Sequence, residues 1–360
     1  MKFLDYLCYG PAGLSNIQMS FECGMILSYL TNRMFVIRNE EPQDHHKPTS
    51  LPEARIPDLF DIPIPYIRDK DTKFYYSKKH TVCSLTNFPF RDSVFFHSDK
   101  LDRKDFVDFV NRRSHIIYYT EKHKECDILT VGENNFDNLS HYSYFFYVRG
   151  KYESRMKRLL KEFRPKKPYR DFIKTVVDEL NSFNSIHVRQ GDFVYMKPAP
   201  FGIKNKTGYD LLKSVSNHFD TNKKIVVCTD DKNNLFDELK QKYECIFIDE
   251  FIREHKQFKY LPFRDDTTVA FLSQHIAGHS DDFIGTFGST FTGLINRYRG
   301  KDDFKYLWAE TKFDSPLQEK YFDNGKMKVT GKGSYSWNSF PYVKAWQGSW
   351  FREWPESFIL

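Results

Sequence analysis

The second half of the chain alternates short apolar runs with longer segments of helical apolar spacing, and this alternation constrains the fold more than any other feature. The apolar runs lie at residues 185–189, 224–229, 245–248 and 282–285. The helical segments lie near residues 169–181, 208–219, 232–242, 267–278 and 289–298. Short apolar runs between helices are typical of strands in a buried parallel sheet. The pattern therefore predicts an α/β domain of the doubly wound, Rossmann-like kind.

The first half opens with the same kind of pattern. An apolar run at residues 2–8 precedes a glycine-containing break at 10–13, a helical segment at 16–31 and a second apolar run at 34–37. Strand, glycine loop, helix and strand form the βαβ unit that opens many nucleotide-binding folds. The stretch from there to about residue 95 is proline-rich and irregular, so we expect insertions around a cleft rather than a separate domain.

A chain of 360 residues has room for two domains of ordinary size. A helix at residues 101–112, a strand at 115–120 and a helix at 152–163 are expected to complete the first domain. Pro165 and Pro168 interrupt the pattern, and the basic run from Arg164 to Arg170 reads as a solvated linker. We therefore expect Rossmann-like domains over 1–165 and 166–310, followed by an aromatic-rich segment over 311–360.

Composition narrows the class of partner and the compartment. The net charge of +6 is a modest excess of 54 basic over 48 acidic residues, which favours a small phosphate-bearing ligand over nucleic acid. The six cysteines include no Cys-x-x-Cys pair, so neither a zinc site nor a disulfide framework is predicted. The N-terminus shows no apolar h-region and the chain no apolar span of membrane length, so we expect a cytoplasmic protein without a transmembrane anchor.

Three polar clusters follow predicted strands, where α/β sheets bind ligands. In the first, His187-Val188-Arg189-Gln190-Gly191-Asp192, the Arg189 guanidinium could grip two phosphate oxygens, or it could form an internal ion pair with Asp192. The second is Thr229-Asp230-Asp231. Thr229 or Asp230 could cap the following helix, which leaves one carboxylate able to accept hydrogen bonds from the N1 and N2 groups of guanine.

The third cluster runs from Gly285 through Ser289 and Thr290 into a helix. A helix start presents free N–H groups and partial positive charge, so Ser289 and Thr290 there would hold pyrophosphate oxygens without a lysine. Simple N-capping by Ser289 is the alternative, but it does not explain the spacing of Gly285, Gly288 and Gly293. The opening loop from Gly10 could also approach a ligand, although glycine turns between strand and helix are common.

Taken in order, these clusters resemble the motifs of the GDP-fucose fucosyltransferase superfamily, which includes the α1,2- and α1,6-fucosyltransferases and the protein O-fucosyltransferases. Gly13-Leu14-Ser15-Asn16 is similar to that superfamily's Gly-x-Gly-Asn-Gln loop, and departs from it at Ser15 and Ile17. The resemblance covers about residues 185–300, whereas residues 40–160 show no family signature. The sequence is identified as a divergent member.

The resemblance implies a GT-B fold, with a cleft between an acceptor-side first domain and a second domain that binds the GDP-sugar. It also implies inverting, metal-independent transfer of fucose from GDP-fucose to a hydroxyl of a glycan. No permanently bound cofactor is implied, because the GDP-sugar is a substrate. The sequence agrees that no metal is needed, because its only Asp-x-Asp, Asp69-Lys70-Asp71, lies in a charged stretch without a strand signal and is expected to be a solvated loop. The segment 311–360 is expected to pack on the first domain, with a sugar-stacking surface of tryptophans as the alternative.

The resemblance also implies roles for the residues that match the family's motifs. Arg189 would contact the β-phosphate and the glycosidic oxygen. The second arginine of some members is Gln190 here, so Arg189 alone would stabilise the negative charge of the leaving group. Asp192 is the first candidate for the catalytic base, with Glu22 as a weaker one on a helix surface, and Asn16 would line the cleft. The residues implied in donor binding are Gly13, Asn16, His187, Arg189, Asp230, Asp231, Gly288, Ser289, Thr290 and Phe291.

Four other functions are weighed against this one. Two keep the chemistry: a protein O-fucosyltransferase, and a transferase that uses another GDP-sugar. A third is a non-catalytic protein that binds a nucleotide or a glycan, because fold and function can separate. The last, a dinucleotide-dependent oxidoreductase, would need a Gly-x-Gly-x-x-Gly followed by an acidic residue at the expected distance, and the chain has none.

Overall fold

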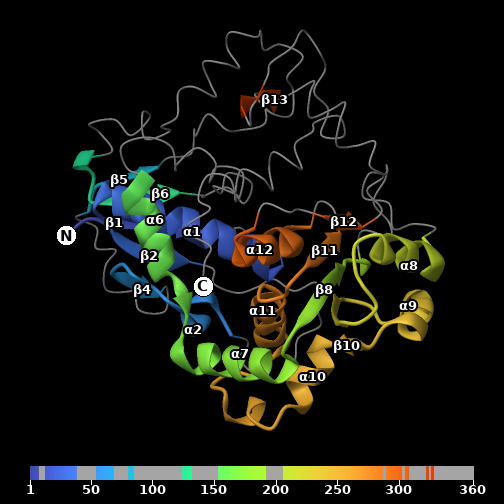
Figure 1. Cartoon of the computed structure of the whole chain (residues 1–360). Coiled ribbons are helices and arrows are strands. Elements are labelled where there is room, and N and C mark those ends of the chain that lie inside the picture. Colours follow the sequence, from blue (N-terminus) through green and yellow to red (C-terminus); the bar gives the residue numbers. More distant parts are fainter. Residues whose placement is uncertain are drawn as a thin grey trace. The chain divides into compact units, whose positions relative to one another are not determined.

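The computed structural model describes residues 1–7, 13–38, 54–68, 80–84, 124–131, 153–191, 206–286, 289–301, 305–307, 322–323 and 326–327. The chain separates into two compact units, with the boundary in the sequence between Lys166 and Lys167 (Figure 1). The helix expected at 101–112, the strand expected at 115–120 and the Asp-x-Asp at 69–71 lie outside the described residues. Of the segment 311–360, only an antiparallel pair is described, β13 (Phe322–Asp323) and β14 (Lys326–Met327).

Unit 1 contains a parallel sheet of five strands in the order β4-β2-β1-β6-β5. Its strands are β1 (Phe3–Leu7), β2 (Met34–Arg38), β4 (Tyr66–Arg68), β5 (Val82–Ser84) and β6 (Ile128–Val131). Its helices are α1 (Leu14–Thr31), α2 (Ile56–Leu59) and α6 (Glu153–Glu162). The predicted βαβ opening is therefore confirmed as β1-α1-β2.

Two expectations for the first half are wrong. The stretch read as irregular insertions supplies α2 and two sheet strands, β4 and β5. The basic run read as a solvated linker begins with β7 (Arg164–Pro165), which pairs with β3 (Phe60–Asp61), and continues into α7. Tyr169 in that run is fully buried. Charge misled the interpretation, because the run also contains two buried residues, Pro165 and Tyr169.

Unit 2 is also built on a parallel sheet of five strands, in the order β10-β9-β8-β11-β12. The strands are β8 (Phe183–Val188), β9 (Lys224–Thr229), β10 (Cys245–Phe247), β11 (Phe283–Thr286) and β12 (Tyr306–Leu307). The helices are α7 (Lys167–Leu180), α8 (Gly208–Ser216), α9 (Asp237–Lys242), α10 (Ile248–Glu254), α11 (Asp266–Ala277) and α12 (Thr290–Arg299), with 3₁₀ turns η5 (Asn234–Phe236) and η6 (Phe258–Tyr260). The predicted doubly wound α/β class is confirmed.

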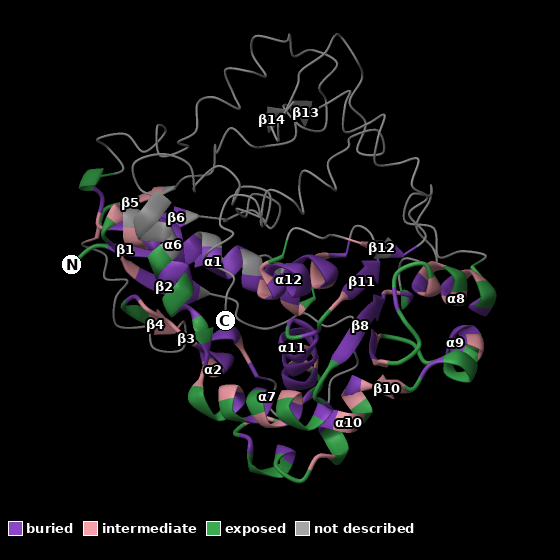
Figure 2. Ribbon diagram, in the orientation of Figure 1, coloured by how far each residue is buried: buried purple, intermediate pink, exposed green. Residues whose placement is uncertain are grey.

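The core of unit 2 lies around its central strands. Every residue of β8 and β11 is buried, and Figure 2 shows both strands and α11 in the buried colour. Burial on both faces explains why these strands read as continuous apolar runs rather than as alternating patterns. Among the described residues, no helix combines the length and the apolar character needed to cross a membrane.

Gly24 fits α1 closely onto the sheet of unit 1. A Cβ at this position would lie 2.7 Å from Cδ1 of Tyr6 and 2.9 Å from Cζ of Phe35, and both rings are fully buried. Alanine has better helix propensity than glycine by about 1 kcal/mol, but overpacking a core costs about 1–3 kcal/mol. We therefore expect Gly24→Ala to lower the free energy of unfolding by up to about 2 kcal/mol.

Denaturant unfolding measures this change. The matched control is Gly13→Ser at the start of α1, where an added Cβ would have nothing within 4 Å. There the free energy of unfolding should change by no more than about 0.5 kcal/mol. Equal effects of the two substitutions would contradict the packing proposed for α1.

Candidate functional site

The three polar clusters meet at one edge of the sheet in unit 2. Strand β8 lies between β9 and β11 and is parallel to both, so the three carboxyl ends lie side by side. Arg189 follows β8, Asp230 follows β9, and the loop to α12 follows β11. The carboxyl ends of adjacent parallel strands are where open α/β sheets bind their ligands.

Arg189 and Asp230 form a partly buried ion pair across this edge. Nη1 of Arg189 lies 3.0 Å from Oδ2 of Asp230, and the two side chains are 24% and 14% exposed. The other carboxylate oxygen of Asp230 accepts a hydrogen bond of 2.7 Å from the backbone N–H of Gln190. The sequence left open an internal ion pair between Arg189 and Asp192. The structure shows a partner directly after the neighbouring strand β9, and Asp192 lies outside the described residues.

Gln190 joins the loops after β8 and β9. Its buried amide donates to the backbone oxygen of Asp231 at 2.7 Å and accepts from Nδ2 of Asn233 at 2.7 Å. Asn233 also donates to Oδ2 of Asp231 at 3.1 Å, while its own Oδ1 caps η5 by accepting from the N–H of Leu235. Gln190 therefore connects the two loops through its side chain.

This arrangement also shows which residue caps the helical turn after β9. Asn233 caps the turn that follows β9, so neither Thr229 nor Asp230 caps it. The Thr229 hydroxyl instead donates to the backbone oxygens of Val188 and Asp231, at 2.9 Å each. Asp230 faces Arg189, and Asp231 is exposed.

His187 is buried at the end of β8. Its Nδ1 lies 2.7 Å from Oγ1 of Thr292, and its ring stacks on Phe291 with centroids 4.6 Å apart. Burial, with a smaller contribution from the charge of Arg189, lowers the pKa of His187 from 6.5 to about 3. The imidazole is therefore neutral near pH 7 and adds no charge to the site.

Thr286, at the end of β11, holds the backbone of the motif arginine. Its hydroxyl accepts from the N–H of Arg189 at 2.8 Å and donates to the backbone oxygen of His187 at 3.1 Å. Gly285 beside it has a packing role, because a Cβ there would lie 2.5 Å from Cγ2 of Thr292. A glycine in β11 thus lets α12 approach the sheet closely.

The start of α12 completes the site. Ser289 is its N-cap residue and is buried, but its side chain makes no capping hydrogen bond. The simple capping role is therefore not seen. Thr290 is the first residue of the helix, and Phe291 follows against His187. The first turn of such a helix directs N–H groups and partial positive charge outward, which suits a phosphate.

The remaining predicted residues are less fully placed. Gly288, like Asp192, lies outside the described residues. Gly13 is the N-cap of α1 and is exposed, and Asn16 lies in the first turn of that helix. Glu22, expected on a helix surface, is fully buried and accepts a hydrogen bond of 3.1 Å from Nε2 of Gln18. The expectation that Glu22 lies on a helix surface is therefore wrong.

Several contacts of the site were not predicted. Thr286, Thr292 and Asn233 were not singled out from the sequence, although Thr286 ends β11, Asn233 follows β9 and Thr292 lies in the first turn of α12. No cluster of three or more His, Cys, Asp or Glu side chains that could hold a metal ion occurs within the described part of the chain.

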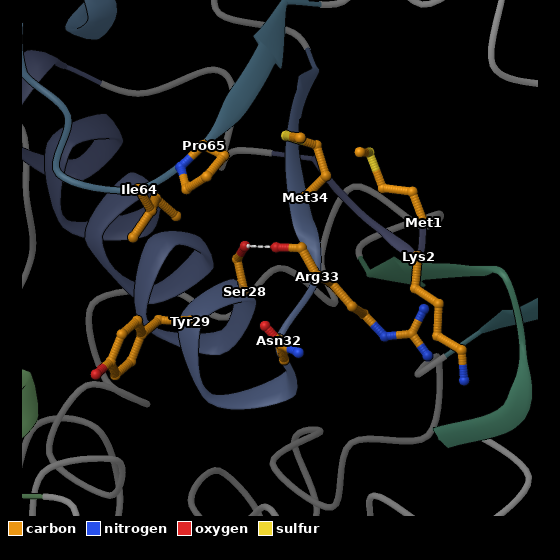
Figure 3. A pocket seen from close by; sticks show the side chains of 9 residues that line it. All are labelled: Met1, Lys2, Ser28, Tyr29, Asn32, Arg33, Met34, Ile64 and Pro65. Atoms are coloured by element: carbon orange, nitrogen blue, oxygen red, sulfur yellow. Dashed lines mark hydrogen bonds between the residues drawn. The ribbon is translucent and has the colours of Figure 1, made fainter.

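A separate pocket in unit 1 has a volume of about 490 Å³ (Figure 3). It is lined by Met1, Lys2, Ser28, Tyr29, Asn32, Arg33, Met34, Ile64 and Pro65. The guanidinium of Arg33 is engaged within the protein, because it donates to the backbone oxygens of Phe3, Cys126 and Asp127. None of the predicted site residues lines this pocket.

The buried imidazole of His187 predicts a pH dependence of stability. The unfolded chain takes up a proton at His187 near pH 6.5, whereas the folded chain does not until about pH 3, so stability falls as the pH drops through this window. Between pH 7 and pH 5 the free energy of unfolding should fall by about 2 kcal/mol more in the wild type than in His187→Gln. Urea unfolding at the two pH values measures this, and equal falls in the two proteins would show that His187 is not buried neutral.

No protein-family model and no curated protein sequence matches the chain. Among solved structures, POFUT1 in complex with GDP-fucose matches in two crystal forms, each with a TM-score of 0.50. The identities are 11% and 14%, over 86% and 85% of this chain and 98% of POFUT1. The fucosyltransferase NodZ from Bradyrhizobium aligns over 82% of this chain and 92% of its own, with 12% identity and a TM-score of 0.46. The chain therefore shares the fold of the POFUT1 structures, in agreement with the GT-B-type α/β fold predicted from its sequence.

Proposed function

We propose that this protein is a glycosyltransferase that moves fucose from GDP-fucose to a hydroxyl of a glycan acceptor. The observation that carries the proposal is the position of Arg189, at the tip of the central strand β8 and beside the strand that leads into α12. The similarity of fold to POFUT1, whose crystal structure contains GDP-fucose, supports this proposal, as does the order of the three sequence motifs. Unit 2 would bind the donor and unit 1 the acceptor.

The diphosphate would lie between Arg189 and the start of α12. The guanidinium would contact the β-phosphate and the glycosidic oxygen, while Ser289 and Thr290 at the helix start would hold the other phosphate oxygens. One carboxylate of the pair Asp230 and Asp231 would accept hydrogen bonds from guanine, and neutral His187 would lie near the nucleoside. Gly288 and Phe291 would complete the phosphate loop.

The transfer would proceed by inversion. The acceptor oxygen attacks the anomeric carbon as the bond from that carbon to the β-phosphate oxygen breaks, and GDP leaves with the electron pair. Arg189 and the helix start stabilise the charge that develops on the diphosphate, so the reaction needs no divalent metal. Asp192 would take the proton of the acceptor hydroxyl.

Nucleotide binding tests this proposal. We expect GDP to raise the melting temperature more than UDP or ADP, with the same increase in EDTA. Arg189→Ala should weaken GDP binding by about 10- to 100-fold, because it removes charged hydrogen bonds to phosphate. Thermal unfolding and titration calorimetry measure the two effects.

The matched control is Lys174→Ala, which removes an exposed cation on α7 that pairs with Asp178. It should leave GDP affinity unchanged. A protein that shows no preference for GDP, or that needs a divalent metal to bind it, would contradict the proposed function.

A further inference from the structure

We propose that Asp230 is a positioning residue for Arg189 and does not read the base. This assignment rests on the function proposed above, and it divides the roles of two adjacent aspartates that the sequence could not distinguish. Both oxygens of Asp230 are already engaged within the protein. Oδ2 pairs with Nη1 of Arg189 at 3.0 Å, and Oδ1 accepts the Gln190 N–H at 2.7 Å.

The backbone bond fixes the carboxylate in place. Gln190 directly follows Arg189, so the residue that holds Asp230 belongs to the same turn as the guanidinium that Asp230 contacts. The backbone N–H of Gln190 and the side chain of Arg189 therefore each bind one oxygen of the Asp230 carboxylate. Such a closed arrangement restricts the rotamers of Arg189, which is the property that an arginine needs to meet a diphosphate without reorganisation.

Gly191 makes the close approach possible. A Cβ at this position would lie 2.7 Å from Oδ2 of Asp230 and 3.8 Å from Cζ of Arg189. A side chain on residue 191 would thus force the carboxylate away from the guanidinium. Three successive residues therefore serve the same carboxylate. Arg189 supplies the cation, Gln190 the N–H donor, and Gly191 the space for the carboxylate.

Burial adds to the importance of the pair. The side chain of Asp230 is 14% exposed and that of Arg189 24%, so water screens the pair only in part. Asp231 differs in its partner, because its carboxylate accepts a hydrogen bond from Asn233. A base that approaches this edge would find Asp230 occupied.

The direction in which Asp230→Asn changes the affinity for GDP distinguishes a positioning role of Asp230 from an effect of its charge. Asp230→Asn removes a negative charge near the phosphate site, and by charge alone it would strengthen the binding of an anion. Its amide group would also set an N–H donor against either the Arg189 guanidinium or the Gln190 N–H, so one of the two contacts that position Arg189 is lost in either orientation. A loss of affinity for GDP therefore reports on the position of Arg189 and not on the charge of Asp230.

Titration calorimetry with GDP, GMP and ADP tests the assignment. We expect Asp230→Asn to weaken GDP binding about tenfold, to leave GMP binding unchanged because GMP lacks the β-phosphate, and to preserve the preference for GDP over ADP. In the Arg189→Ala background the same substitution should cause no further loss, because the two residues act as one unit. Gly191→Ala should reproduce the pattern, and it serves if Asp230→Asn does not fold. The control Asp220→Asn changes an exposed aspartate of unit 2 and should have no effect.

Three results would overturn the assignment. Unchanged or tighter GDP binding in Asp230→Asn would show that Asp230 does not hold the arginine. Equal weakening of GDP and GMP, with a reduced preference over ADP, would show that Asp230 reads the base. Losses that add in the double variant would show that the residues act separately. A wild-type protein that does not prefer GDP is recognised before any variant is made, and it would refute the proposed function together with this assignment.

Discussion

The site depends on the position of β8 between β9 and β11. Because the three strands are parallel, each delivers its following residues to the same edge of the sheet. The Thr286 hydroxyl then links β11 to the end of β8, and the Thr229 hydroxyl links β9 to it. A shift of β8 by one residue would turn Arg189 to the other face, because side chains alternate along a strand.

Polar groups at this edge are satisfied mainly by one another. The amide of Gln190, the hydroxyls of Thr229 and Thr286, and the carboxylate of Asp230 each have a hydrogen-bond or ion-pair partner from a neighbouring strand or loop. Burying such groups without partners would cost about 1–3 kcal/mol each. The contacts that order the site therefore also stabilise the sheet edge, so a substitution there affects stability as well as binding.

The sequence predicted the central elements because their signals are strong. Buried strands such as β9 and β11 appear as apolar runs, and their predicted limits differ by a residue at most. Shorter strands such as β4 and β7 carry no such signal, since pairing with a neighbour rather than local composition makes them strands. Helix α10 was missed because it follows β10 directly, and its first residue, Ile248, extends the apolar run.

The candidate site was predictable only in part for a similar reason. A strand followed by charged residues indicates a ligand edge, which brought out Arg189 and the aspartate pair. The sequence left the partner of Arg189 open and suggested Asp192 by its nearness. The structure shows an ion pair with Asp230, which follows another strand, and Asp192 lies outside the described residues. Strand order decides such pairs, and a single sequence does not contain it. Glu22 was expected to be exposed and is buried, because helical spacing did not reveal that α1 is covered on that side too.

A crystal structure of the protein with GDP would test the central claim most directly. The account predicts a diphosphate with oxygens within hydrogen-bonding distance of the Arg189 guanidinium and of the backbone N–H groups at the start of α12, while Asp230 keeps its bond to the Gln190 N–H. A nucleotide bound elsewhere, or a diphosphate that contacts neither Arg189 nor the start of α12, would contradict it.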